Sequence, residues 1–223
     1  MSAQPAAPGL GIDGGCRVGP FELTARFTCA PRSVTVIQGP NGSGKTTLLR
    51  VVAGVTGLWN GTLRIGDRTV DDPARRTWVG PVDRSIGFVP TDGVLFEHLS
   101  ALDNVAYGLR RRGRSRTDAR RRARELLDAF DAGALAGQSP SELSSGQTQR
   151  VALARALAIE PGVLLLDEAF SAIDADSRPG LRARVLDELR PSDSVVLLVT
   201  HDADEAAASA DQLLTIDDGH IAP

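Results

Sequence analysis

The sequence predicts an α/β fold with a mostly parallel central sheet. Two runs, "VLLL" at 163–166 and "VVLLV" at 195–199, are wholly apolar, as strands that helices cover on both faces are. Segments with the apolar spacing of helices precede and follow each run. Buried strands that alternate with helices are typical of parallel sheets. The length of 223 residues suits a single domain, 1–223, with one subdomain.

The first ninety residues are expected to hold most of the strands. Residues 1–15 are rich in Gly, Ala and Pro, and we expect them to be frayed. Alternating and β-branched patterns predict strands over 21–29 and 33–38, and shorter ones in "GTLRI" and "SIGFV". The segment "KTTLLRVVAG" has helical spacing. We expect an antiparallel β part at this N-terminal end.

Residues from about 92 to 160 show only helix and loop patterns, which predicts a helical subdomain inserted between strands. Ser100, followed three positions later by Asp103, marks the start of its first helix. A charged helix in "TDARRRARELLDAFDAG" is expected to end at Gly133. An alanine-rich helix in "GQTQRVALARALAIE" precedes a Pro-Gly pair, and a later helix is expected at about 176–189. A short helix and the strand "QLLTI" close the chain.

The composition disfavours several functions. Hydrophobic residues make up 42%, charged residues 24%, and the net charge is 25 − 28 = −3, which is typical of a soluble globular chain that does not bind polyanions. Aromatic residues make up only 4%, which disfavours a base-stacking surface for nucleic acid. No apolar run is long enough to cross a bilayer, so any membrane role is expected to come through a partner. Cys16 and Cys29 lack CxxC spacing and are expected to be ordinary reduced thiols.

The segment "GPNGSGKT" fits the phosphate-loop pattern G-x-x-x-x-G-K-[ST] without mismatch. It follows a predicted strand and opens a predicted helix, so backbone N–H groups and the helix N-terminus can surround an anionic phosphate. The predicted ATP-binding residues are Gly39, Pro40, Asn41, Gly42, Ser43, Gly44, Lys45, Thr46 and Thr47.

Lys45 is the sole lysine, and the other 24 basic side chains are arginine. An ammonium is a compact charge on a flexible stem and can reach between the terminal phosphates, whereas the planar guanidinium is bulkier. We therefore expect Lys45 to act in catalysis, and Thr46 to offer its hydroxyl to Mg²⁺.

Asp167 and Glu168 follow the apolar run in "VLLLDE". The C-terminal end of a strand is where α/β sheets present ligand groups. Asp167 can hold Mg²⁺ through water, and Glu168 is placed to polarise an attacking water. In isolation such an acidic pair is also an ordinary helix start, but the intact phosphate loop in the same chain favours the catalytic interpretation.

The segment "LSSGQTQRVALARAL" at 143–157 resembles the signature of ATP-binding-cassette (ABC) ATPases, "LSGGQ" with its following helix. "DEAFSAID" resembles their Walker B and D-loop segment, which Asp174 closes, and "LLVTHDADEA" resembles the switch segment with His201 as its histidine. "GVLFEHLSALDNVAYGL" is similar to the segment that contains the helix after the Q-loop in importer ATPases. The resemblance extends over about 20–222.

This resemblance implies a P-loop NTPase of ABC type that binds ATP and Mg²⁺. It implies a head-to-tail dimer in which each ATP lies between one subunit's phosphate loop and the other's signature. Glu168 would orient the water and His201 would contact the γ-phosphate, whereas His98 and His220 are expected on the surface. The predicted signature residues are Ser144, Ser145, Gly146 and Gln147.

Three positions depart from the family pattern. Thr91 stands where the Q-loop has glutamine, and its short side chain cannot reach Mg²⁺ and the attacking water in the same way. Ser145 replaces a glycine of the signature, a small change that we expect to be tolerated. No clear aromatic residue is placed to stack on adenine: Phe21 is expected in the core, and Arg17 or Val18 could cover the base instead.

The segments "TVDDPARRTWVGPVDRSIGFVP" and "RVGPFEL" resemble importer ATPases of the molybdate/sulfate/iron group. The resemblance implies the energy-coupling subunit of an importer for a small solute such as an oxyanion, peripheral on the cytoplasmic side of the membrane. Its partners would be a second copy of the chain, an integral membrane permease and, indirectly, a solute-binding protein, with no nucleic acid. The chain ends at Pro223, and we expect it to lack the C-terminal regulatory domain that such subunits often carry.

Other interpretations remain open. A soluble ABC ATPase that acts as a nucleotide-driven clamp is one, although a single cassette without coiled-coil heptads favours transport. A regulatory ATPase of impaired activity is another, suggested by Thr91 and opposed by the intact catalytic residues. Nine arginines within 110–124 form either a solvated helix face, which we favour, or a contact for anionic lipid head groups or an acidic partner.

Overall fold

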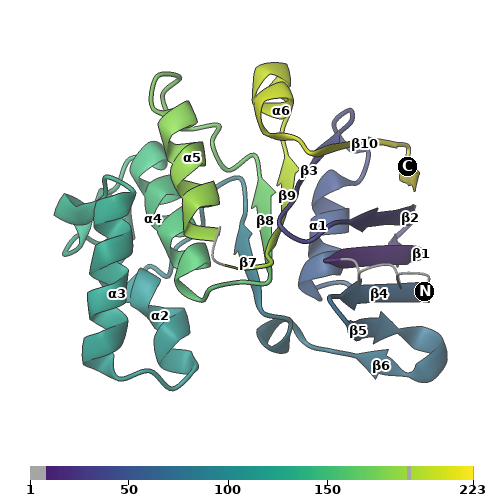
Figure 1. Cartoon of the computed structure of the whole chain (residues 1–223), viewed down its shortest axis with the longest axis horizontal. Helices are drawn as coiled ribbons and strands as arrows, with labels where there is room; N and C mark the ends of the chain where they lie inside the picture. The colour runs from purple at the N-terminus through teal and green to yellow at the C-terminus, as the bar shows by residue number, and fades with distance from the viewer. Residues whose placement is uncertain (1–8, 190–191, 223) are drawn as a thin grey trace, which may run out of the picture. The chain divides into compact units, whose positions relative to one another are not determined.

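The computed structural model describes residues 9–189 and 192–222, which form two compact units (Figure 1). The first unit comprises Met1–Ile86 and Asp193–Pro223, and the second comprises Gly87–Ser192. Within the described ranges no helix is both long enough and apolar enough to span a membrane.

The first unit contains a mixed sheet with the strand order β6-β5-β4-β1-β2-β11-β10-β3-β9. Strand β3 pairs in parallel with β9 and β10, whereas β1 pairs antiparallel with β2 and β4. The predicted antiparallel part at the N-terminal end is therefore confirmed. The strands are β1 (Leu10–Val18), β2 (Phe21–Cys29), β3 (Val34–Gln38), β4 (Asn60–Ile65), β5 (Arg68–Asp72), β6 (Thr77–Trp78), β9 (Val195–Val199), β10 (Gln212–Asp217) and β11 (His220–Ala222).

Strand β1 corrects the prediction that residues 1–15 are frayed. The strand begins at Leu10 and pairs with β2 and β4, and the side chains of Leu10, Ile12 and Cys16 are buried. Its glycines allow close backbone approach, since a Cβ atom on Gly14 would lie 2.4 Å from the carbonyl oxygen of Asn60. Residues 1–8 of the predicted frayed segment lie outside the described residues.

Among the described residues of the first unit, two helices and two 3₁₀ turns accompany this sheet. Helix α1 follows β3 and packs near β9 (Figure 1). Both cysteines of the unit are free and buried. Burial raises the pKa of the Cys29 thiol to about 11 and also raises that of Cys16, so both thiols are unreactive at neutral pH. The helical elements are α1 (Lys45–Ala53), α6 (Ala203–Ser209), η1 (Pro73–Arg75) and η2 (Pro81–Asp83).

Arg84 is a buried cation that closes the C-terminal end of α1. Its guanidinium donates to the carbonyl oxygens of Val51 at 2.8 Å and Val52 at 3.0 Å, and to that of Val79 at 2.7 Å. An ion pair with the buried carboxylate of Asp71 spans 3.6 Å. Helix ends leave carbonyl groups without partners in the helix, and a cation there also interacts favourably with the helix dipole.

We expect Arg84→Met to lower the free energy of unfolding by about 3–5 kcal/mol, because it leaves the Asp71 carboxylate buried without its cation. Urea denaturation followed by circular dichroism measures the change. Arg26→Met is the matched control, since Arg26 pairs with Asp13 at the solvent-exposed surface and such pairs stabilise little. Equal losses in the two variants would contradict the role assigned to Arg84.

The second unit is mainly helical. Strands β7 and β8 are neighbours in its sheet, and α2 packs against both α3 and α4 (Figure 1). The segment between the two strands holds α2, α3 and α4, and the predicted extent of the helical subdomain, about 92–160, stays a prediction. The elements are β7 (Ile86–Val89), α2 (Ala101–Arg111), α3 (Arg116–Ala129), η3 (Gly133–Leu135), η4 (Pro140–Glu142), α4 (Ser145–Ala158), β8 (Val163–Asp167) and α5 (Arg178–Leu189).

The observed helix boundaries agree with one predicted helix end and differ from another. The Ser100 hydroxyl accepts from the Asp103 N–H at 3.2 Å, which confirms the predicted start of α2. The predicted end of the charged helix at Gly133 is wrong by four residues, because α3 ends at Ala129. Asp131 has a φ of 53° and turns the chain away from the helix.

The arginine-rich segment 110–124 is largely paired within the fold. Arg120 forms a two-pronged contact with Asp103 in α2, and Arg122 pairs with Glu188 in α5 at 2.6 Å. Arg124 donates to the carbonyl oxygen of Gly133. These contacts support the interpretation of this segment as a structural, solvated helix face.

Candidate active site

The phosphate loop joins β3 to α1, as predicted. Gly44 is the N-cap of α1 and has a φ of 109°, a conformation that favours glycine. A Cβ atom at Gly44 would also lie 2.8 Å from the ring of Phe21 and 3.0 Å from Leu23. Phe21 is half-buried, so the prediction that it belongs to the core is only partly correct: its ring edge supports the phosphate loop.

The ammonium of Lys45 lies over this loop. It donates to the carbonyl oxygens of Gly39 and Pro40, both at 2.8 Å. The ammonium carries three N–H donors on a flexible stem, so it can exchange these contacts for phosphate oxygens. The loop therefore holds its cation where an anionic ligand would lie.

Ser43 gives a direct test of whether a phosphate fits the loop. Its hydroxyl is buried and, among the described residues, makes no hydrogen bond. A buried hydroxyl without a partner costs free energy, and a phosphate oxygen at the N-terminus of α1 would supply one. Thr46, which follows Lys45 in the first turn of α1, is exposed. The residues present fit a phosphate ligand, and the exposed position of Thr46 next to Lys45 is consistent with its predicted contact to Mg²⁺.

His201 lies at the same edge of the sheet as the phosphate loop. Strands β3 and β9 are parallel, with Ile37 paired to Val199. The loop follows β3 and His201 follows β9 within two residues, so both leave the sheet at its C-terminal edge. The imidazole of His201 is exposed, as are those of His98 and His220, for which surface positions were predicted.

The acidic pair of the second unit ends the buried strand β8. Asp167 is buried, and Glu168 is half-buried just beyond the strand. Glu168 has a φ of 50°, a left-handed conformation that costs a non-glycine residue about 1–2 kcal/mol. Its carbonyl oxygen accepts from the Ser171 N–H at 3.0 Å, which closes the turn after the strand. Strained backbone of this kind clusters at functional sites.

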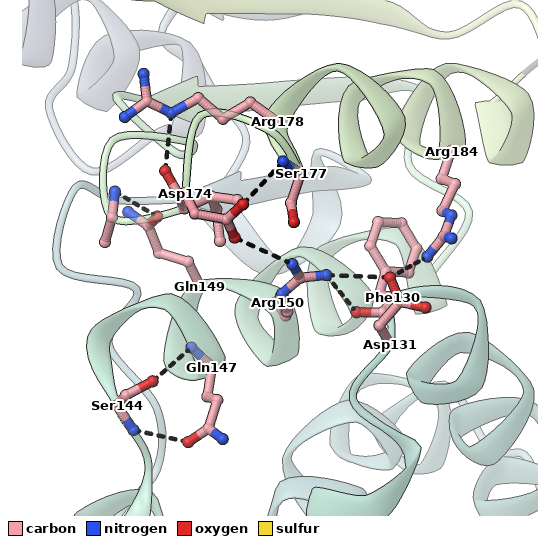
Figure 2. Close-up of polar contacts among 12 residues, drawn as sticks. Phe130, Asp131, Ser144, Gln147, Gln149, Arg150, Asp174, Ser177, Arg178 and Arg184 are labelled. Carbon is pink, nitrogen blue, oxygen red and sulfur yellow. Dashed lines mark hydrogen bonds and ion pairs between the residues drawn. The ribbon is translucent and has the colours of Figure 1, made fainter.

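The signature segment forms an exposed helix N-terminus (Figure 2). Ser144 is the N-cap of α4: its hydroxyl accepts from the Gln147 N–H at 3.3 Å, and the Gln147 side chain accepts from the Ser144 N–H at 2.9 Å. Ser144 and Ser145 are exposed, and Gly146 follows within the first turn. The positive end of the α4 dipole and the exposed hydroxyls of Ser144 and Ser145 at this terminus would suit an anion.

Asp174 is held in place by α4 and α5. It accepts from the Ser177 N–H at 2.9 Å and lies 4.0 Å from the guanidinium of Arg150 (Figure 2). Hydrogen bonds from Ser177 and the charge of Arg150 lower the pKa of Asp174. Arg150 also pairs with Asp131, which follows α3. One cation of α4 therefore contacts both Asp174 and the chain just after α3.

Residues 24–171 match the family described as ABC transporter. The chain belongs to this family. The resemblance inferred from the signature is thereby confirmed, as is the α/β fold of ABC type.

Relatives of this ABC protein are named as import ATP-binding proteins. The sulfate/thiosulfate protein CysA 2 of Rhizobium meliloti (strain 1021) is 45% identical over 189 residues, which cover 83% of this chain and 50% of the relative. The Fe(3+) ions protein FbpC of Pseudomonas fluorescens (strain Pf0-1) is 45% identical over 189 residues, which cover 84% of this chain and 52% of the relative. The chain thus spans about half the length of these curated relatives.

A solved structure of the same fold is a dimer. It is described as a post-hydrolysis state of the ATP-binding cassette MJ0796 bound to ADP and Pi. The TM-score is 0.81, the sequence identity is 26%, and the match covers 96% of this chain and 97% of the other.

The Q-loop position of this ABC chain is connected to α4. Thr91 is exposed just beyond β7, and its carbonyl oxygen accepts from the Gln149 side chain at 3.0 Å. Gln149 was not among the site residues predicted from the sequence. A sequence pattern could have revealed it, because Gln149 is a polar residue on the apolar face of α4. Ala152, Leu153 and Ala156 continue that face three, four and seven positions later.

The cover of the adenine base stays a prediction. Arg17 stacks over the ring of Trp59 at 4.1 Å and pairs with Glu22 at 2.7 Å. Val18 is about half exposed at the end of β1. Because Arg17 is already held by Trp59 and Glu22, Val18 is the better candidate to cover the adenine base.

Proposed function

We propose that this chain is the ATP-hydrolysing, energy-coupling subunit of an ABC importer. The observation that carries the proposal is the presence in one chain of a complete phosphate loop and of a buried strand that ends at Asp167, with Glu168 directly after it. The names of the relatives, which are import ATP-binding proteins, support the direction of transport.

The proposed roles follow from the chemistry of each group. Lys45 and the N–H groups of α1 bind the terminal phosphates. Thr46 and Asp167 would hold Mg²⁺, which neutralises phosphate charge when it is bound. Glu168 accepts the proton of the attacking water, and His201 donates to the γ-phosphate.

A second copy of the chain is the proposed first partner. Ser144 and Ser145 are exposed at the start of α4, where they can complete the ATP site of another subunit. The solved relative of this fold is dimeric, which supports such pairing. We infer a homodimer that closes on ATP and reopens after hydrolysis.

An exposed aromatic patch supports a further protein partner. Phe96 and Tyr107 are exposed by 39% and 40%, and their ring centroids lie 4.7 Å apart. The guanidinium of Arg155 lies 5.4 Å from the centroid of the Phe96 ring. Val94, two positions before Phe96 in the sequence, is exposed by 61%. Exposed apolar patches mark interaction sites, and the proposed occupant is a membrane permease, served by a solute-binding protein.

The proposed cargo is a small solute such as an oxyanion. The two relatives named above import sulfate/thiosulfate and Fe(3+) ions, and both are small inorganic ions. The proposed location is the cytoplasmic face of the cell membrane, where the chain would be held by the permease.

A pull-down of the tagged chain from its own membranes in mild detergent tests this function. We expect an integral membrane permease to co-purify, and Phe96→Ser to reduce its recovery because the exposed ring is lost. Recovery from the soluble fraction alone, with nucleic acid or ribosomes attached, would contradict transport and favour a soluble clamp.

A further inference from the structure

Gln149 is a buried amide that holds two loops of the second unit. It lies in the second turn of α4, and its side chain is only 1% exposed. Its nitrogen donates to the carbonyl oxygen of Thr91 at 3.0 Å, and its oxygen accepts from the Ala172 N–H at 3.1 Å. The same nitrogen makes two longer contacts, to the Glu168 carbonyl oxygen and to the Ser171 hydroxyl, each at 3.5 Å.

The partners determine which way the amide of Gln149 faces. A carbonyl oxygen of Thr91 requires a donor, and an N–H of Ala172 requires an acceptor. A flipped amide would place oxygen against oxygen on one side and N–H against N–H on the other. The orientation is therefore fixed, and an apolar side chain of the same volume would leave both backbone groups without this partner.

The two loops carry the chemistry of the unit. Thr91 occupies the Q-loop position beyond β7. Ala172 lies in the turn between Glu168 and Asp174, and Glu168 has the left-handed backbone described above. Since α4 begins at the signature, Gln149 joins the signature helix to the Q-loop position and to the turn that follows Glu168.

We propose that Gln149 is a positioning residue for ATP hydrolysis. It keeps the turn that bears Glu168 and the Q-loop position in register with the signature helix, so a movement of α4 moves Glu168. The proposal rests on the proposed ATPase function. It concerns turnover and not ATP binding, because the hydrogen bonds of Gln149 to the described residues all lie within the second unit, whereas the phosphate loop belongs to the first.

Steady-state kinetics of Gln149→Leu test the proposal. We expect kcat to fall by about 10- to 100-fold, as for groups that orient a catalytic residue. We expect the KM and the Kd for ATP to stay within about twofold of wild type, because no phosphate contact is changed. Gln138→Leu is the matched control: Gln138 is half-buried in the same unit, and its described hydrogen bonds are made by its backbone.

A second variant and a second measurement separate positioning from simple packing. Gln149→Glu keeps the oxygen that faces Ala172 but loses both N–H donors, so we expect it also to lower kcat. Hydrogen exchange at the Ala172 amide is expected to be faster in Gln149→Leu and unchanged in Gln138→Leu.

Three outcomes would overturn the proposal. One is a wild-type kcat in Gln149→Leu. Another is a parallel loss of kcat and ATP affinity with a lowered Tm in both Gln149 variants, which would make Gln149 a core residue only. The third is unchanged exchange at the Ala172 amide. Absent turnover in the unmodified chain would instead count against the proposed function.

Discussion

Glu168→Gln is expected to bind ATP normally and to lose steady-state hydrolysis by about 100-fold or more. A carboxylate that accepts the proton of the attacking water contributes about 10²- to 10⁴-fold, and an amide cannot accept it. The amide has nearly the same shape, so the left-handed turn at Glu168 is retained. Phosphate release measures turnover, and size-exclusion chromatography with ATP is expected to show an accumulated dimer.

Glu160→Gln is a matched control for this prediction. Glu160 is exposed at the end of α4 and has a φ of 49°, so the same chemical change is made at the same backbone conformation outside the site. We expect its turnover to equal that of wild type. Unchanged turnover in Glu168→Gln would refute the assignment of Glu168 as the base.

Lys45→Ala is expected to weaken ATP binding by at least about 30-fold. Removing one partner of a desolvated charge pair costs about 2–5 kcal/mol, and each 1.4 kcal/mol is about tenfold in Kd. Lys45→Arg is expected to fail as well, because the ammonium lies within 2.8 Å of two loop carbonyl oxygens and the guanidinium is larger. Isothermal titration calorimetry with ATP measures both variants.

Arg50→Ala serves as the control for Lys45. Arg50 lies on α1 with an exposed side chain, so its replacement by alanine removes one positive charge from the same helix. We expect its ATP affinity to match that of wild type. Equal losses of ATP affinity in Lys45→Ala and Arg50→Ala would mean that ATP binding depends only on the net charge of α1.

The parts of the fold that the sequence predicted are those with strong local signals. Strand β9 and the first four residues of β8 are wholly apolar because both faces of these strands are buried. The phosphate loop requires glycine at Gly44 for two separate reasons, backbone conformation and the adjacent Phe21 ring. The cap of α2 at Ser100 depends on residues three positions apart.

The missed features depend on contacts between distant residues. Strand β1 has a glycine-rich sequence that suggested flexibility. The structure instead requires glycine at position 14, because the backbone of Asn60 leaves no room for a side chain there. The left-handed conformation of Glu168 follows from its position after β8 and from no property of glutamate. The partners of Gln149 lie 58 and 23 residues away in sequence, beyond any local pattern.

The ammonium over the phosphate loop is the only side-chain amine of the 223 residues. A reagent that acylates lysine therefore has one side-chain target, and that target lies in the loop where nucleotide is proposed to bind. Acetyl transfer to it, whether by a chemical or an enzyme, would remove the charge that the site needs. Bound nucleotide is thus expected to slow acylation of this nitrogen atom, and acylation is expected to weaken nucleotide binding, so the rate of acylation would measure occupancy of the site.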